Sequence, residues 1–288
     1  MTDRSACWLI VNPSSGSNAG GEAVDGEPID VATMLNERAW IVTRKVTFPC
    51  DPLPPMQTLD EESIRLAVVH AGDGTVSAVL NHLQDWDGQV LVLPGGTMNL
   101  LSRRLHGNAT TREILDIVAA GRSRAHRISA LAHEHGIAFA ELLAGPGTCW
   151  HEVRESMRDG AVTDIATNAV EALRQTTERP HVWPRGMSLA REAGYKLVAI
   201  VPGEWGLRVD GYFAEDAIDF AAQAWQTVRR QFREGPHDRL GLSDRITLTT
   251  MDNSPLPCLA DGEPVECADG YEFTAIEPQV ELVATGHD

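Results

Sequence analysis

Three apolar runs in the first third of the chain each lead into a short polar segment that contains glycine. The runs cover residues 8–11, 66–69 and 90–93, and the segments that follow begin at Asn12, His70 and Pro94. Short apolar runs bounded by such turns are typical of buried parallel strands joined by helices. Because ligands bind where the carboxyl ends of parallel strands meet, the pattern predicts a nucleotide-binding α/β lobe in this half.

The hydrophobic pattern of the sequence changes after about Arg127. Alternating segments at residues 126–131, 137–143, 196–201, 245–249 and 272–276 indicate antiparallel strands. Longer helices are expected at residues 163–177 and 215–234. The second of these has an apolar face that includes Trp225 and Phe232, and arginines gather near its end. Packing against a sheet is the usual arrangement for such a helix, and docking on a bilayer is the alternative.

Charge and cysteine content limit the partners and the compartment. The net charge is −17 and no run is dense in Lys or Arg, which argues against nucleic-acid binding and against constitutive binding to anionic membranes. Five cysteines without a C-x-x-C pair indicate free thiols in a reducing compartment. The sequence shows no signal peptide and no apolar run of about 18 residues, so we expect a cytoplasmic protein, at most peripherally bound to membrane.

The first two glycine-containing segments have the chemistry of a phosphate site. The small residues after Asn12 let backbone N–H groups and hydroxyls approach a phosphate closely. Gly72 and Gly74 permit a tight turn before a helix expected at residues 75–83, whose first turn offers N–H donors and a positive dipole end. Asp73 would repel a phosphate unless a metal intervenes, which makes it a candidate organiser of phosphate and magnesium.

The third segment places Thr97 and Asn99 where they could hydrogen-bond a nucleotide or an acceptor. Any one of the three segments could instead be an ordinary turn. Their shared position, each at the end of an expected strand, favours a common site.

The chain resembles the diacylglycerol kinase catalytic family, which also includes sphingosine kinases, ceramide kinases and small bacterial lipid kinases. The motif at residues 71–75, G-G-D-G-T in the family, is also found in NAD kinases and phosphofructokinases. Four motifs in the family's order and spacing, by contrast, single out lipid kinases. The four are Asn12-Pro13-Ser14-Ser15-Gly16, Ala71-Gly72-Asp73-Gly74-Thr75, Pro94-Gly95-Gly96-Thr97-Met98-Asn99 and Asp261-Gly262-Glu263.

The resemblance implies an α/β fold of two lobes. Residues 1–126 would form a parallel-sheet, ATP-binding lobe of the phosphofructokinase and NAD-kinase type. Residues 127–288 would form an antiparallel β-sandwich lobe with helices, with a cleft between the two lobes.

The resemblance also implies ATP and Mg²⁺ as cofactors and a lipid hydroxyl as acceptor, met transiently at a membrane surface. Glu263 would be the base that deprotonates the acceptor, with Asp73 as the second catalytic residue, while the metal ligands stay open. The nucleotide-binding residues carried over are Asn12, Pro13, Ser14, Ser15, Gly16, Thr43, Gly72, Asp73, Gly74, Thr75, Val76, Ser77, Gly96, Thr97 and Asn99.

Departures from the family pattern leave alternatives open. Ala71 replaces the first glycine of G-G-D-G-T, Ala78 replaces a glutamate, and Leu100 replaces an aspartate. The alternatives are an NAD-kinase-like phosphotransferase acting on a soluble acceptor, and a catalytically silent nucleotide- or lipid-binding protein. The lipid acceptor and the oligomeric state, a homodimer among the options, are not determined by the sequence.

Overall fold

The computed structural model describes residues 4–15, 23–24, 27–28, 30–149, 181–213 and 237–286. The chain forms two compact units, one of Met1–Ile128 with Glu277–Asp288 and one of Ser129–Ile276. The helices expected at residues 163–177 and 215–234 lie outside the described residues. Among the helices that are described, none is long and apolar enough to cross a membrane.

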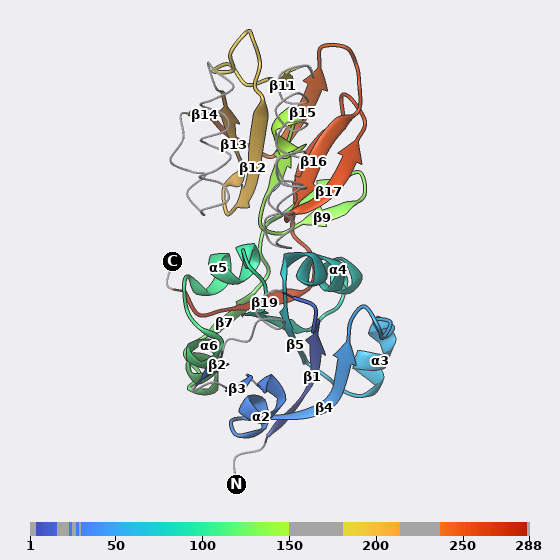
Figure 1. Ribbon diagram of the computed structural model, residues 1–288, viewed down its shortest axis with the longest axis vertical. Helices are drawn as coiled ribbons and strands as arrows, with labels where there is room; N and C mark the ends of the chain where they lie inside the picture. Colours follow the sequence, from blue (N-terminus) through green and yellow to red (C-terminus); the bar gives the residue numbers. More distant parts are fainter. Residues whose placement is uncertain are drawn as a thin grey trace, which may run out of the picture. The chain divides into compact units, whose positions relative to one another are not determined.

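Six strands form the sheet of the first unit, in the order β4-β1-β5-β6-β19-β7 (Figure 1). Neighbouring strands are parallel except for β7, which runs antiparallel to β19 at the edge. The strands are β1 Ser5–Val11, β4 Trp40–Thr47, β5 Leu66–Ala71, β6 Gln89–Pro94, β7 Arg124–His126 and β19 Glu281–Ala284, and a separate short ribbon pairs β2 Ala23–Val24 with β3 Glu27–Pro28.

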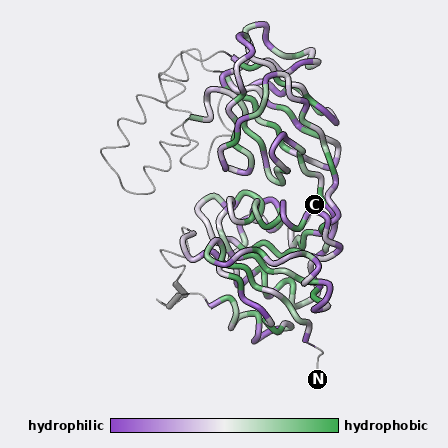
Figure 2. The backbone as a smooth tube through the Cα atoms, turned by 90° about the vertical axis from the view of Figure 1, so that its right-hand side faces the viewer, coloured by the Kyte–Doolittle hydropathy of each residue, from purple (hydrophilic) through white to green (hydrophobic). Residues whose placement is uncertain are grey.

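Helices cover both faces of this sheet, which explains why every residue of β5 is buried. Leu35 of α2 and Ile114 of α6 pack with Leu91 on one face. On the other face, α3 and α4 lie over the neighbouring strands (Figure 1). Hydrophobic colouring is concentrated along the strands inside the unit in Figure 2. The helices are α2 Val31–Asn36, α3 Met56–Glu61, α4 Asp73–Leu83, α5 Leu100–His106 and α6 Thr111–Ala119.

Two antiparallel sheets make up the second unit and enclose its hydrophobic core. Their orders are β14-β13-β12-β10-β16-β17 and β11-β15-β18-β8-β9. This arrangement confirms the predicted α/β fold class, with one largely parallel sheet and one antiparallel lobe. The elements are β8 Ala130–His133, β9 Gly136–Ala138, β10 Leu142–Ala144, the 3-10 turn η1 Pro146–Cys149, β11 Val182–Arg185, β12 Leu197–Gly203, β13 Gly206–Tyr212, β14 His237–Ser243, β15 Arg245–Thr250, β16 Leu256–Ala260, β17 Glu263–Cys267 and β18 Glu272–Ile276.

Three details differ from the sequence expectation. The segment at 126–131 is not one strand, because the chain leaves the first unit between Ile128 and Ser129. The segment at 137–143 is split into β9 and β10. Residues 277–288 belong to the first unit, although the sequence analysis assigned them to the second lobe, because β19 pairs with β6 and β7.

Candidate functional site

The carboxyl ends of β1, β5 and β6 lie side by side in the first unit. Val11 pairs with His70, and Ala71 pairs with Pro94, so the three strands end at the same level of the sheet. The three glycine-containing segments therefore emerge together, as the sequence predicted for a parallel sheet.

Side chains of the first segment bind the second segment directly. The Asn12 side-chain amide donates to the Thr75 hydroxyl at 2.8 Å, and the Ser15 hydroxyl accepts from the Gly72 N–H at 2.9 Å. Asn12 also accepts from the Ser14 N–H at 2.9 Å, which closes its own turn. These contacts hold the two loops together within the protein.

The third segment approaches the second so closely that only glycine fits. A Cβ atom added at Gly96 would lie 2.5 Å from the Cα atom of Gly72, closer than any real Cβ contact. Asn99 adopts a left-handed backbone with φ +52°, and its side chain brackets Gly96 by accepting from its N–H and donating to its carbonyl, both at 2.7 Å. The Asn99 amide thus holds the loop rather than projecting freely.

Asp73 makes contacts that the sequence analysis did not anticipate. Its carboxylate accepts from the backbone N–H groups of Asn99 at 2.9 Å and Leu100 at 2.6 Å, so it caps the start of α5. The first turn of α4 is different, because its N-cap residue Gly72 has no side-chain cap. The first N–H groups of an α-helix have no intrahelical acceptors, so α4 offers donors and a positive dipole end to an anion.

Other residues carried over from the family pattern occupy varied positions. Val76 is buried, and its N–H donates to the Gly72 carbonyl inside α4, so this N–H is already engaged. Ser77 is half-buried on the same helix, whereas Thr97 and the Pro13–Ser14 pair are exposed at the ends of their strands. Gly16 lies outside the described residues.

Thr43, which was carried over from the family pattern, lies in the interior of a strand. It lies within β4, which continues to Thr47 because its pairing with β1 persists as far as Val11. Its hydroxyl donates to the Cys7 carbonyl at 3.3 Å, beside an irregularity in the pairing. Four residues of strand separate Thr43 from the carboxyl end, or about 13 Å, so it lies away from the three loops.

His70, within the second segment, was not singled out by the sequence. It is buried one residue before the end of β5. Burial lowers the pKa of its imidazole, although a hydrogen bond with the backbone of Pro94 acts in the opposite direction. The neutral ring therefore links the ends of β5 and β6 without adding charge to the site.

The Asp261-Gly262-Glu263 segment forms the turn between β16 and β17 in the second unit. Asp261 and Gly262 have φ values of +50° and +88°, as a tight hairpin turn requires. The buried Asp261 carboxylate accepts from the N–H groups of Phe139 at 2.8 Å, Ala140 at 2.7 Å and Glu141 at 3.0 Å. Burial raises the pKa of Asp261, while these N–H groups partly offset the effect.

Glu263 is the first residue of β17 and is exposed. The structure therefore divides the motif: Asp261 stabilises the turn from inside, and Glu263 presents its carboxylate to solvent. Sequence patterns alone do not separate these two roles, because both residues are acidic and only two positions apart.

Metal ligands remain unassigned. Among the described residues, no group of three or more His, Cys, Asp or Glu side chains could hold a metal ion. Asp210 is buried and pairs with Arg208 at 3.0 Å. All five cysteines are free, as expected.

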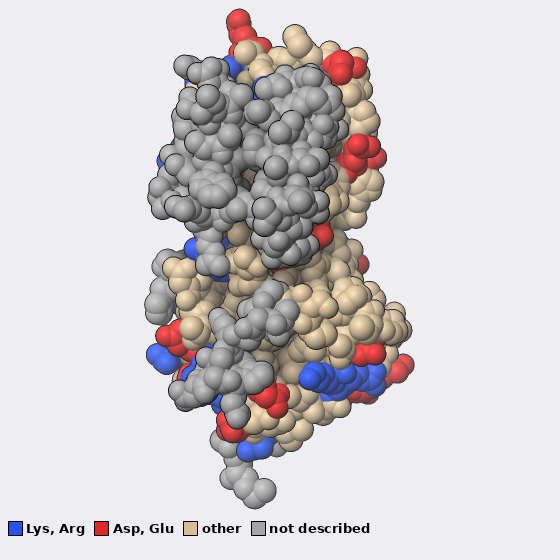
Figure 3. Space-filling model, in the orientation of Figure 1, with Lys and Arg blue, Asp and Glu red and all other residues tan. Residues whose placement is uncertain are grey.

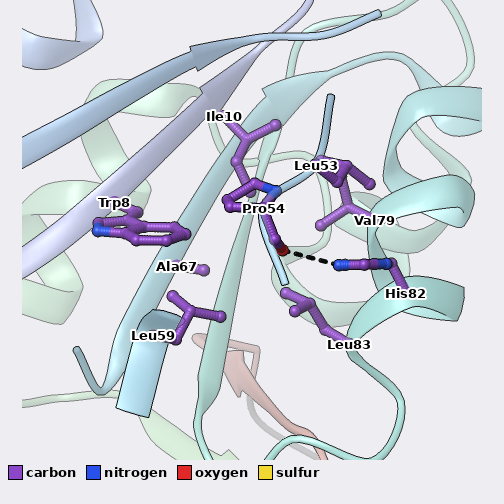
Figure 4. Close-up of a pocket in the computed structure, with 9 residues that line it drawn as sticks. All are labelled: Trp8, Ile10, Leu53, Pro54, Leu59, Ala67, Val79, His82 and Leu83. Carbon is purple, nitrogen blue, oxygen red and sulfur yellow. Dashed lines mark hydrogen bonds between the residues drawn. The ribbon is translucent and has the colours of Figure 1, made fainter. Parts of the chain in front are cut away.

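A small apolar crevice lies between α3, α4 and the sheet of the first unit (Figure 4). The ring of His82 hydrogen-bonds the Pro54 carbonyl at 2.8 Å across one side of it. Its walls are almost entirely hydrocarbon and include Trp8, Leu59 and Leu83, so they offer no donors for a phosphate. On the surface of the same unit, Lys and Arg side chains lie beside Asp and Glu side chains (Figure 3).

Comparison with known proteins agrees with this geometry. The family model of the diacylglycerol kinase catalytic domain matches residues 6–131, the part of the chain that carries the three interlocked loops. Residues 6–131 belong to the diacylglycerol kinase catalytic domain family. Three of the four motifs that suggested this lipid kinase family therefore lie at one edge of a single sheet, and the fourth, at residues 261–263, lies in the second unit.

Solved structures show that the similarity of fold extends over nearly the whole chain. A diacylglycerol kinase from Bacillus anthracis str. Sterne aligns with a TM-score of 0.58 and 13% identity, covering 98% of this chain and 97% of that one. A second protein from the same organism, provisionally assigned as a diacylglycerol kinase, aligns with a TM-score of 0.57, 15% identity and the same coverage. At such low identity the likeness concerns the fold. No curated protein matches the sequence.

Proposed function

We propose that this protein is a lipid kinase that transfers the γ-phosphoryl group of ATP to a hydroxyl of a lipid of the diacylglycerol, sphingoid or ceramide, or phosphatidylglycerol type. The observation that carries the proposal is the interlocked edge of β1, β5 and β6, with the uncapped start of α4 among the loops. Family membership of residues 6–131 supports the reaction type.

The loops bind phosphate mainly through the backbone in this proposal. Asn12 and Ser15 use their polar side chains to bind the second loop, and Asn99 binds Gly96 within its own loop, which fixes the loops in place. The N–H groups at the start of α4 then offer the nucleotide phosphates preorganised donors. Because phosphoryl transfer depends chiefly on positioning and charge stabilisation, a rigid loop edge is suited to it.

Glu263 is the proposed general base. The acceptor hydroxyl oxygen attacks the γ-phosphorus as the bond to the bridging oxygen breaks, ADP leaves, and the hydroxyl proton moves to the Glu263 carboxylate. An exposed carboxylate at the end of a strand is accessible to a bulky acceptor. The proposal thus assigns nucleotide binding to the first unit and proton transfer to the second.

Magnesium is the proposed metal partner of ATP, where it would neutralise charge on the phosphates. Mg²⁺ commonly takes only one or two carboxylates and completes its coordination with water and phosphate oxygens. Asp73 fits such a role, because its carboxylate lies among the three loops, where it accepts from the N–H groups of Asn99 and Leu100. Asp73 would then both cap α5 and contact the metal.

The test is transfer of label from γ-labelled ATP with Mg²⁺ to defined acceptors in mixed micelles, with NAD as a soluble acceptor in a parallel reaction. We expect label in a lipid and none in NAD. Glu263→Gln should lower the rate by about 100-fold or more, because general-base catalysis typically contributes that much. Label appearing in NAD alone would favour the soluble phosphotransferase instead.

Glu266→Gln is the matched control, because Glu266 is also an exposed glutamate of β17. It should keep wild-type activity. If Glu263→Gln is as active as wild type while lipid is still labelled, the base assignment is wrong but the kinase assignment stands. Absence of label in every lipid tested would overturn the lipid kinase proposal itself.

A further inference from the structure

Two large hydrophobic side chains of the second unit are exposed near one turn. Trp205 is 81% exposed in the turn between β12 and β13, and Leu242 is 59% exposed on the edge strand β14. The paired residues Gly203 and Gly206 enclose this turn, and Gly206 lies against the Ser243 carbonyl of β14. We refer to Trp205 and Leu242 together as the tryptophan turn.

The strand pairing places the tryptophan turn at the same end of its sheet as Glu263. Leu142 of β10 pairs antiparallel with Ile200 of β12 and with Ala260 of β16. The strands β12 and β16 therefore run in the same direction, and their following turns leave the sheet at the same end. Two strand spacings, about 10 Å, separate β12 from β16, and β12 runs three residues, about 10 Å, beyond the level of Ala260, so the two turns lie roughly 15 Å apart.

The charged groups around the tryptophan turn have no positive excess. Arg208, which pairs across the sheet with Leu242, forms an ion pair with Asp210 at 3.0 Å. Arg245 forms an ion pair with Glu272 at 3.4 Å. Glu204 and Asp244 are exposed beside them. This surface has no excess of positive charge with which to attract an anionic polymer or an anionic bilayer.

An exposed tryptophan on a surface without excess positive charge is suited to the headgroup region of a neutral bilayer. The indole ring has an apolar body and one N–H donor, and tryptophan concentrates at membrane interfaces for this reason. We propose that the tryptophan turn is a membrane-contact surface that docks on a zwitterionic lipid bilayer and brings the acceptor lipid to Glu263. This inference rests on the proposed lipid kinase function for its purpose, although docking itself can be measured without any reaction.

The test is cosedimentation of the full chain with phosphatidylcholine vesicles in the absence of ATP. Wild type should bind, and Trp205→Ala should weaken the partition coefficient on the order of tenfold, as expected for losing one large apolar contact. Trp205→Phe should restore part of the binding, because it retains an aromatic ring. Thermal unfolding of each variant checks that these exposed substitutions leave the fold intact.

Met251→Ala is the matched control. Met251 is 76% exposed, but it lies in the turn that precedes β16, at the opposite end of the sheet. It should bind vesicles as wild type does. The proposal is overturned if wild type does not bind phosphatidylcholine, if Trp205→Ala binds equally well, or if Met251→Ala loses binding to the same extent.

Vesicles that contain phosphatidylglycerol provide the second arm. The absence of a local positive excess predicts similar or weaker binding there, since the net charge of −17 opposes an anionic surface. Binding only to the anionic vesicles would contradict a neutral docking surface. Vesicle binding that depends on Trp205 in a protein that labels no lipid would retain the docking surface and reject the kinase, so the two proposals fail separately.

Discussion

Polar side chains at the loop edge of the first unit mostly bind other parts of the protein. Asn12 and Ser15 contact the second loop, Asn99 brackets Gly96, and Asp73 caps α5. Apart from the bond between Asn12 and the Thr75 hydroxyl, each of these hydrogen bonds fixes a backbone N–H or carbonyl group in position. Their chemical contribution to a phosphate site is therefore preorganisation of the backbone rather than an additional donor.

Gly96→Ala should separate the second and third loops. Its Cβ atom would meet the Gly72 Cα atom at 2.5 Å, and backbone cannot rotate away as a side chain can. We expect the free energy of unfolding to fall by about 1–3 kcal/mol, as for other overpacked sites, and ATP affinity to fall with it. Urea unfolding and calorimetric titration with ATP measure the two effects.

Gly203→Ala serves as the control for this substitution, because its nearest neighbour beyond the adjacent residues would lie at 3.6 Å, an ordinary contact. Equal stability and ATP affinity in Gly96→Ala and wild type would show that the close approach of the loops is not required.

At the level of strands and helices, the sequence predicted the elements whose signal is local. The helix expected at 75–83 is α4 Asp73–Leu83, and the strand expected at 272–276 has those bounds. The strand expected at 137–143 is broken because the N–H groups of Phe139, Ala140 and Glu141 turn toward Asp261. Periodicity cannot reveal such a contact, since its partner lies far along the chain.

Asp261→Asn should destabilise the second unit by about 2 kcal/mol or more. Asparagine tolerates the left-handed backbone as aspartate does, so the turn itself is retained. Asparagine has only one acceptor oxygen, and its NH₂ group would face a backbone donor, which leaves a buried N–H unpaired. Urea unfolding at pH 7 measures the loss, and hydrogen exchange should quicken at residues 139–141.

Asp252→Asn is the comparison, since Asp252 occupies an exposed turn and bonds the Ser254 N–H at 3.0 Å. It should change stability by less than about 0.5 kcal/mol. A similarly small change in Asp261→Asn would mean that the three hydrogen bonds contribute little.

For the whole molecule, the course of the chain was the hardest feature to predict. A short segment such as residues 281–284, apolar from Leu282 to Ala284, signals a strand but does not identify the strand beside it. Here the run returns to the first unit as β19 and lies between β6 and β7. Which strands become neighbours depends on tertiary packing, so no local pattern could have assigned residues 277–288 correctly.

Residues 277–286, here called the returning segment, end in hydrogen bonds to α5 beside a buried histidine. We therefore expect the free energy of unfolding to depend on pH. The His106 ring contacts the Thr285 hydroxyl at 2.9 Å, and the Leu105 carbonyl accepts from the N–H groups of Thr285 and Gly286. Burial lowers the pKa of His106 to about 4, although the backbone of Val92 partly opposes the shift. The unfolded chain, with a histidine pKa near 6.5, therefore binds more protons between pH 6.5 and 4.

The free energy of unfolding should consequently fall as the pH drops through this window, by about 2 kcal/mol between pH 7 and pH 5 from His106 alone. The pKa of His70 is lowered as well, so the contribution of His106 is measured as the difference between wild type and His106→Gln. Urea unfolding at both pH values should show a smaller pH dependence for His106→Gln than for wild type. His126→Gln, a change at an exposed histidine of β7, should keep the wild-type dependence. If His106→Gln also keeps it, acid does not act through the attachment of the returning segment to α5.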